Sequence, residues 1–235
     1  MPFIMKSVVI RSLMLLALVF SSIPLARGAD PLVPPATQDA SFEDVADVPG
    51  LPRVLLIGDS ISMGYTLPVR ELLKGKANVH RIPANAATTT NTLDQFGNWI
   101  PAGPWDVIHC NWGLHDIKRM PDGKRQVSLE DYERNLRELV QRLKPIGRKL
   151  VWCSTTPVPG TELDPPRFNE DVIAYNTVAR RVMAEDGIPV DDLYSFVLPQ
   201  ADRIRKPLNV HFTSRGCLVL AQQVARCIEQ VIAAD

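Results

Sequence analysis

The sequence predicts an α/β fold, in which helices cover both faces of a central parallel sheet of five strands and form a three-layer sandwich. Two observations indicate this fold. Short apolar runs alternate with amphipathic segments of helical length, which is the pattern of successive βα units. The chain of 235 residues is also long enough for one hydrophobic core of this size.

The N-terminus has the layout of a secretory signal peptide, and we assign residues 1–29 to it. Lys6 and Arg11 are followed by an apolar run at 13–20 and by small residues in "LARGA", with cleavage expected near Gly28 or Ala29. The run is shorter than a membrane span, which needs about 20 residues. An uncleaved anchor is the alternative interpretation. We therefore expect a secreted or periplasmic protein without stable membrane insertion after cleavage.

A Pro-rich extended leader with no element of its own is expected at residues 30–52, and one domain is expected at 53–235. The predicted strands are residues 53–57, 78–82, 106–111, 149–153 and 188–190. The predicted helices are residues 62–74, 90–99, 129–144, 169–185 and 214–233. The segment 154–168 carries four prolines, and a loop of this length is typical of a functional region.

The helix expected at 129–144 has the clearest signals. Ser128 is a favourable N-cap, and Pro145 and Gly147 end the pattern. One apolar stripe recurs at helical spacing between them, namely Leu129, Tyr132, Leu136, Leu139, Val140 and Leu143. This helix is therefore expected to pack one face against the sheet.

Charge and cysteine content exclude some classes of protein. Lys plus Arg and Asp plus Glu each number 26, so the formal charge is zero and no nucleic-acid footprint is present. The four cysteines, which export would allow to pair, have three possible pairings. They equally fit buried thiols, because Cys110 and Cys153 end apolar runs. The other two cysteines are Cys217 and Cys227. The sequence does not indicate an oligomeric state.

Ligands of open α/β sheets bind at the carboxyl ends of the strands, and Ser60 lies at such an end. It follows the apolar run 54–57, where a helix N-terminus would favour negative charge. Position alone favours a simple helix cap. A nucleophilic serine needs a base, and His211 lies in an irregular stretch before the last helix. His80 and His109 lie within strands and are expected to be structural.

Three motifs together resemble the SGNH (GDSL-type) hydrolases: "IGDSIS", "GLHD" and "VHFTSRG". The resemblance covers residues 53–235. It implies a flavodoxin-like sandwich and ester hydrolysis through an acyl-serine, with Ser60 as nucleophile and His211 as base. It also implies that no metal or cofactor is needed. The residues Cys110, His115 and Asp116 likewise lack the spacing of a closed zinc site.

The oxyanion hole departs from the family pattern. The family's glycine is replaced within "PANAATTT", so the N–H of Ala86 or Ala87 is expected to act beside that of Ser60. The family's asparagine is replaced by His115, whose neutral ring can donate one N–H. A structural hydrogen-bonding role is the alternative for His115. Asp116 is expected to fix its tautomer, and Asp59 is the other supporting carboxylate.

The family's acid three residues before the histidine is absent, because Leu208 occupies that position and Asn209 follows it. Asn209 can accept a hydrogen bond from the ring but supplies no charge. Three explanations stay open. His211 is oriented by a backbone carbonyl, an acid such as Asp202 or Asp191 reaches it, or the enzyme is weakened.

The sequence thus predicts an exported serine esterase acting on small acyl esters, chiefly acetyl esters of carbohydrates. Trp99 and Trp112 are candidate rim aromatics, although Trp112 fits the core equally well. The alternatives are a lipase or lysophospholipase, an acyltransferase with the same residues, and a catalytically impaired glycan-binding protein. The substrate expected is a small acyl ester or an acylated carbohydrate.

Overall fold

Five parallel strands form the central sheet, in the order β2-β1-β3-β4-β5. The computed structural model describes residues 38–160 and 163–234. The strands are β1 (Arg53–Ile57), β2 (Asn78–Arg81), β3 (Trp105–Cys110), β4 (Gly147–Cys153) and β5 (Val190–Asp191). This is the flavodoxin-like strand order, in which β1 and β3 are neighbours and the crossovers diverge on either side of them. The predicted fold class is confirmed.

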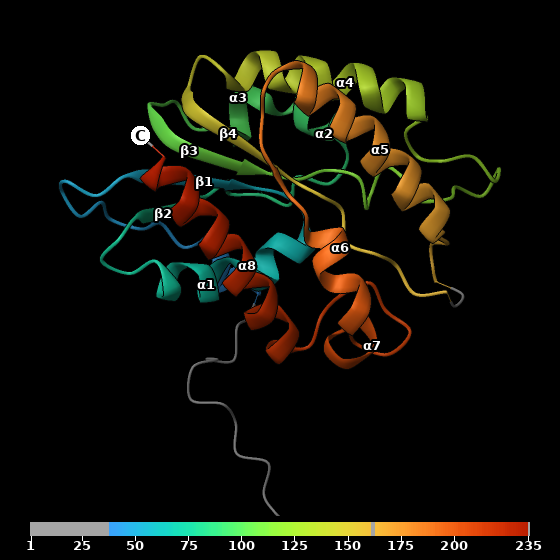
Figure 1. Ribbon diagram of the computed structural model, residues 1–235. Coiled ribbons are helices and arrows are strands. Elements are labelled where there is room, and N and C mark those ends of the chain that lie inside the picture. Colours follow the sequence, from blue (N-terminus) through green and yellow to red (C-terminus); the bar gives the residue numbers. More distant parts are fainter. Residues whose placement is uncertain (1–37, 161–162, 235) are drawn as a thin grey trace, which may run out of the picture. The chain divides into compact units, whose positions relative to one another are not determined.

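Helices cover both faces of this sheet. One face carries α1 (Ser60–Leu72) and α8 (Ser214–Ala233), which lie side by side (Figure 1). The other carries α2 (Thr89–Asp94), α3 (Phe96–Trp99), α4 (Leu129–Leu143) and α5 (Asn169–Glu185) (Figure 1). Shorter elements complete the domain: η1 (Gln38–Phe42), α6 (Leu193–Val197), η2 (Leu198–Gln200) and α7 (Ala201–Ile204).

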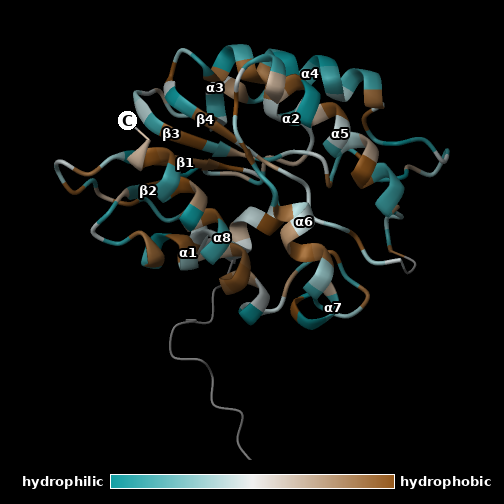
Figure 2. Cartoon of the chain, in the orientation of Figure 1, coloured by the Kyte–Doolittle hydropathy of each residue, from teal (hydrophilic) through white to brown (hydrophobic). Residues whose placement is uncertain are grey.

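The core lies between the sheet and these helices. The last four residues of β1 are completely or almost completely buried, as expected of a central parallel strand covered on both faces. Ser128 caps α4 by accepting the N–H of Asp131, and the apolar stripe of this helix is turned inward apart from Leu129. Figure 2 shows the consequence, because α4 is largely teal on its outer side whereas β1 and β3 are largely brown.

Some predicted elements need correction. The single helix expected at 90–99 is two short helices, which meet at Gln95. The helices α6 and α7 were not predicted, because five and four residues are too few for a recognisable period. Trp112 belongs to the core, where its indole N–H donates to Thr92.

The leader is not without structure, because residues 38–42 form η1 against α1. Polar contacts then hold residues 47 and 48 beside β2. The buried amide of Asn78 bonds both the N–H and the carbonyl of Val48, and Asp47 bonds His80 at 2.7 Å. These contacts join segments that are far apart in the sequence, so composition alone did not predict them.

The predicted signal peptide, residues 1–29, lies outside the described residues. Within residues 38–160 and 163–234, none of the helices has the length and apolar character needed to cross a membrane. All four cysteines are described and all are free thiols, so none of the three pairings is present.

Candidate active site

Ser60 and His211 meet at the carboxyl edge of the sheet. Ser60 is the first residue of α1, directly after the turn that follows β1, and its Oγ lies 2.8 Å from Nε2 of His211. His211 comes from a hairpin just before α8, in which Arg205 and Phe212 form an antiparallel bridge. The two residues are 151 positions apart in the sequence, so only the folded sheet brings them together.

The turn before Ser60 is held by Asp59 and Arg81. Asp59 caps α1, since its Oδ1 accepts the N–H of Ile61 at 2.9 Å. The buried guanidinium of Arg81, at the end of β2, donates to the Gly58 carbonyl at 2.8 Å and to Ser62 Oγ at 2.6 Å. The N–H of Ser60 is one of the free donors of the first helical turn, so it is available to a negative charge.

The hairpin that carries His211 is fixed by close packing on α7. Gly216, in the first turn of α8, lies against the carbonyl of Ile204, and a Cβ at this position would collide with it. Thr213 caps α8 through its hydroxyl and also donates to the same carbonyl at 3.0 Å. These contacts set the start of α8 and therefore the position of His211 two residues before the cap.

Asn209 orients the base. Its Oδ1 accepts both the ring Nδ1–H of His211, at 2.7 Å, and the backbone N–H of His211, at 3.0 Å. The backbone N–H of His211 can only donate, so the Asn209 amide must present its oxygen to His211. The ring nitrogen that contacts this same oxygen must then donate too, so the ring proton lies on Nδ1. Nε2 is then the acceptor that faces the Ser60 hydroxyl. Leu208, at the position of the family's acid, is 71% exposed.

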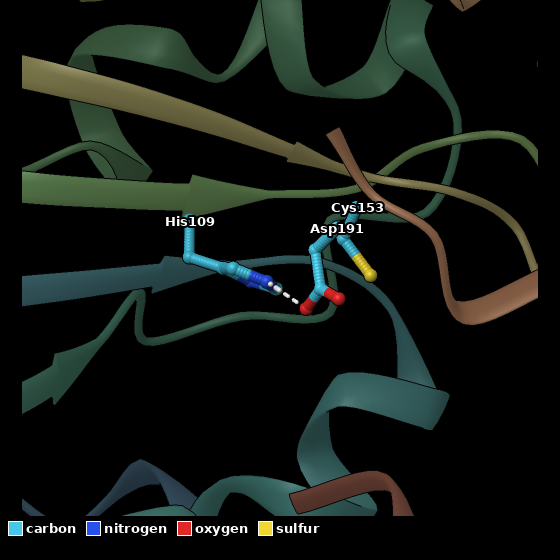
Figure 3. Close-up of side chains that lie close together, drawn as sticks. All are labelled: His109, Cys153 and Asp191. Carbon is cyan, nitrogen blue, oxygen red and sulfur yellow. Dashed lines mark hydrogen bonds and ion pairs between the residues drawn. The ribbon is translucent and has the colours of Figure 1, made fainter. Parts of the chain in front are cut away.

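Neither acid proposed from the sequence reaches His211. Asp202 is fully exposed and pairs with Arg205. Asp191 is buried and bonds His109 at 3.0 Å, and the two side chains point toward each other in Figure 3. The first two explanations for the missing acid are therefore wrong, because the ring Nδ1–H of His211 bonds the side-chain amide of Asn209 and neither a backbone carbonyl nor a distant acid.

His109, Cys153 and Asp191 form a buried cluster whose ligand-type atoms lie within 4.8 Å of one another (Figure 3). These residue types can bind a metal. Most of these atoms have protein partners, however, because Asp191 accepts from His109 and from Gln223, and the Cys153 thiol faces the Ser154 carbonyl at 3.8 Å. Among the described residues, Nδ1 of His109 has no hydrogen-bond partner. The cluster fits a hydrogen-bonded core pair, which is the structural role expected for His109.

The electrostatic surroundings keep His211 neutral. Burial lowers the pKa of His211, and the cations Lys206 and Arg167 lower it further, whereas Asp59 opposes them. A lowered pKa means that the unprotonated base is present at neutral pH. The site therefore holds a serine whose hydroxyl can donate to a ready base.

The expected backbone donors of the "PANAATTT" loop are already occupied. The N–H of Ala86 donates to the Gly58 carbonyl at 3.1 Å, and the N–H of Ala87 donates to Asn85 Oδ1 at 2.9 Å. Ala87 has a φ of 51°, so the chain here keeps the left-handed conformation that favours glycine. Ala86 is thus not a free donor, and Ala87 becomes one only when the Asn85 side chain releases it.

His115 follows β3 on a loop that starts beside the Ser60 turn. Gly113 has a φ of 146° and lies against the hydroxyl of Thr155, which leaves no space for a side chain. The partner of the His115 ring is not Asp116, as expected, but Lys118, whose Nζ lies 3.0 Å from Nδ1. Asp116 is turned inward, where it accepts the N–H and hydroxyl of Thr89, and burial raises its pKa to about 6.

Arg167 is a site residue that sequence reasoning missed. It comes from the Pro-rich loop 154–168, is only 9% exposed, and donates from Nε to the Leu114 carbonyl at 2.9 Å. Its charge lowers the pKa of both His115 and His211. The loop was recognised as functional, but no spacing or motif distinguished this arginine from the others.

Known proteins share this fold, and one known family matches most of the chain. Residues 56–217 match the GDSL-like lipase/acylhydrolase family, a span that includes Ser60, His115 and His211. Among curated proteins, no sequence matches the chain.

Three solved structures are similar in fold. A lipase/acylhydrolase from Enterococcus faecalis has a TM-score of 0.65 and 21% identity, over 77% of this chain and 96% of that chain. The acetylxylan esterase Axe2 from Geobacillus stearothermophilus has a TM-score of 0.61 and 22% identity, over 74% and 93%. The acetyl xylan esterase AlAXEase has a TM-score of 0.64 and 15% identity, over 75% and 99%.

At these identities the structural likeness shows the fold alone, and the family match carries the assignment. That match spans more than half of the chain, and it confirms the resemblance seen in the sequence motifs. The chain belongs to the GDSL-like lipase/acylhydrolase family and is an ester-hydrolysing enzyme of the SGNH type.

Proposed function

We propose that the protein is an exported serine esterase that removes short acyl groups, chiefly acetyl, from carbohydrates. The observation that carries the proposal is the chain of hydrogen bonds from Ser60 Oγ to His211 Nε2, at 2.8 Å, and from His211 Nδ1 to Asn209, at 2.7 Å. This is the geometry of a nucleophile activated by an oriented base.

The reaction follows from these contacts. Ser60 Oγ attacks the ester carbonyl carbon while His211 takes the hydroxyl proton, and the resulting oxyanion is held by the Ser60 N–H and by His115. His211 then gives the proton to the leaving alcohol. A water molecule, deprotonated by His211, attacks the acyl-serine, and collapse of the second oxyanion releases the acid and restores Ser60.

We infer that the polar alcohol of the ester occupies a groove next to Arg167. A groove of about 580 Å³ adjoins Arg167 and carries both apolar and polar side chains, which are those of Pro159, Leu163, Pro166, Arg167, Phe168, Asn169 and Glu170, together with Gly160. Phe168 is exposed, as a ring that stacks on a sugar has to be, and the Arg119 guanidinium lies over its ring at 5.3 Å. Two of the similar structures named above are acetylxylan esterases by name, which favours the same substrate class.

Acetate release from acetylated xylan, compared with hydrolysis of a long-chain p-nitrophenyl ester, tests the substrate class. We expect a higher kcat/KM on the acetylated glycan. Ser60→Ala should lower kcat/KM by about four orders of magnitude or more, whereas Ser195→Ala, at an exposed serine of α6, should leave kcat/KM unchanged. Full activity of the Ser60→Ala protein would refute the mechanism, and a preference for the long chain would refute the substrate.

Asn209 supports one second candidate, a glycan-binding protein with weakened catalysis, because an amide gives the imidazolium less stabilisation than a carboxylate does. That candidate predicts glycan binding with no acyl-serine formed. A fluorophosphonate probe separates the two, since only an activated serine reacts with it readily.

A further inference from the structure

The turn that carries His115 ends in a lysine that contacts the same histidine. Lys118 donates its backbone N–H to the His115 carbonyl at 3.2 Å, and its Nζ lies 3.0 Å from His115 Nδ1. Its own carbonyl accepts the N–H of Gln126 at 2.7 Å, and Ile117 closes the turn onto Gly113. The backbone of Lys118 is thus hydrogen-bonded on both sides. Only a change of side-chain rotamer would therefore move the ammonium group away from the His115 ring.

The chemistry of this contact decides where the imidazole proton lies. An ammonium group only donates hydrogen bonds, so Nδ1 of His115 must accept with its lone pair. The ring proton is then on Nε2, and the ring is neutral. Among the described residues no protein group bonds this Nε2, which leaves its N–H free at the half-buried edge of the site.

A neutral ring also suits the neighbouring base. Burial lowers the pKa of His115, and the charges that face it add to this: Lys118 in its own turn, Arg167 from the Pro-rich loop and His211 from the hairpin before α8 all lower it. Asp59, before α1, opposes them. His211 becomes a cation in the transition state, so a second charged imidazole beside it would raise the barrier.

We propose that Lys118 is a positioning residue that holds His115 as a neutral imidazole with its proton on Nε2, so that this N–H occupies the place of the missing amide donor in the oxyanion hole. The inference rests on the proposed function, since it concerns the same ester-hydrolysing site. It assigns a role to a residue that no motif includes.

A purely structural role explains Lys118 less well. The neighbouring Asp116 is turned toward Thr89, and among the described residues no carboxylate lies within ion-pair distance of Lys118. Burial lowers the pKa of Lys118, so holding the ammonium group in this place is unfavourable by itself. The contact with His115 Nδ1 is the interaction that the position provides.

The test compares Lys118→Met in two backgrounds, the natural chain and His115→Asn. In the natural background we expect kcat to fall about tenfold with little change in KM, as for one weakened oxyanion donor. The acidic limb of the rate profile should also move to higher pH, because the pKa of His115 rises when the cation is removed. An asparagine needs no tautomer, so in the His115→Asn background the same substitution should change kcat by less than about threefold.

Lys124→Met is the matched control, because Lys124 is an exposed cation nearby that pairs with Asp122 and does not contact His115. It should leave kcat and the pH profile unchanged. Lys118→Gln, which keeps a donor but no charge, should restore part of the lost kcat. Equal losses from Lys118→Met in both backgrounds, or an unmoved pH profile, would overturn the proposal.

Nitrogen NMR of the natural protein gives a readout that needs no variant to fold. We expect the chemical shift of an unprotonated Nδ1 and a protonated Nε2 for His115, and a protonated Nδ1 would overturn the proposal. The outcome is separable from that for the proposed function. If Ser60→Ala stays active, the esterase mechanism fails, whereas an inactive Ser60→Ala with a fully active Lys118→Met refutes only the role of Lys118.

Discussion

Replacing Asn209 by aspartate turns the acceptor of the His211 Nδ1–H hydrogen bond from a neutral amide oxygen into a carboxylate. The present bond is 2.7 Å long, and the same oxygen also accepts the His211 backbone N–H, so a carboxylate fits this position without moving the chain. A hydrogen bond to a charged group contributes about 1.5–3 kcal/mol, against about 0.5–1.5 kcal/mol for a neutral pair. The difference between the midpoints of these ranges, roughly 1.25 kcal/mol, acts in the transition state, where His211 is a cation, and corresponds to about an eightfold rise in kcat.

The assay is kcat/KM for p-nitrophenyl acetate from about pH 5 to about pH 9. In the natural protein burial lowers the pKa of His211 from its ordinary 6.5, so the acidic limb should lie below that value. The carboxylate of the variant raises this pKa, because it favours the protonated ring. The acidic limb should therefore move to higher pH, and the gain should be present only on its alkaline side.

Leu208→Asp is the matched control for this prediction. It places an acid at the family's usual position, but that residue is 71% exposed here and has a φ of 51°. Aspartate tolerates this conformation better than leucine does, so the variant should fold, and its kcat should stay within about twofold of the natural value. The reasoning is refuted if Leu208→Asp reproduces the gain, or if Asn209→Asp leaves both kcat and the acidic limb unchanged.

Three further substitutions test the scaffold of the site. Asp116→Asn should remove a pH dependence of stability: burial raises the pKa of Asp116 from 3.8 to about 6, so the folded state keeps this proton longer than the unfolded chain. The free energy of unfolding should therefore fall between these two values as the pH rises, by on the order of 3 kcal/mol, and urea titrations at both ends should show no such fall in the variant. Arg81→Met removes the donors beneath the Ser60 turn and should lower both kcat and the free energy of unfolding, the latter by about 2–4 kcal/mol in urea titrations; an unchanged unfolding midpoint would contradict this. Gly216→Ala places a Cβ against the Ile204 carbonyl, so both the melting temperature and kcat should fall, and a variant as stable and active as the natural protein would show that α8 does not depend on this contact.

The sheet and its main helices could be predicted because their signals are local. The apolar runs of β1, β3 and β4 and the stripe of α4 each lie within one segment of the sequence. The short helices α6 and α7 could not, because they depend on packing against α8 and the 198–200 turn. The contact between Ser60 and His211 could be expected from the position of their loops at the carboxyl edge of the sheet.

The supporting residues were harder to predict because their roles depend on side-chain geometry. Asn209 was recognised as a possible acceptor, but only the local turn shows that one oxygen serves both donors of His211. Lys118 is three residues from His115, yet the neighbouring Asp116 was the more obvious partner until its burial against Thr89 was seen. Arg167 approaches the site through an irregular loop whose course no sequence pattern specifies.

Reaction with a fluorophosphonate probe, followed by mass spectrometry of the peptides, tests the central claim most directly. The account predicts that one probe adds to the natural protein, that the modified residue is Ser60, and that His211→Ala slows the labelling by a factor on the order of a thousand. Labelling at another serine, or a rate at Ser60 that does not depend on His211, would contradict it.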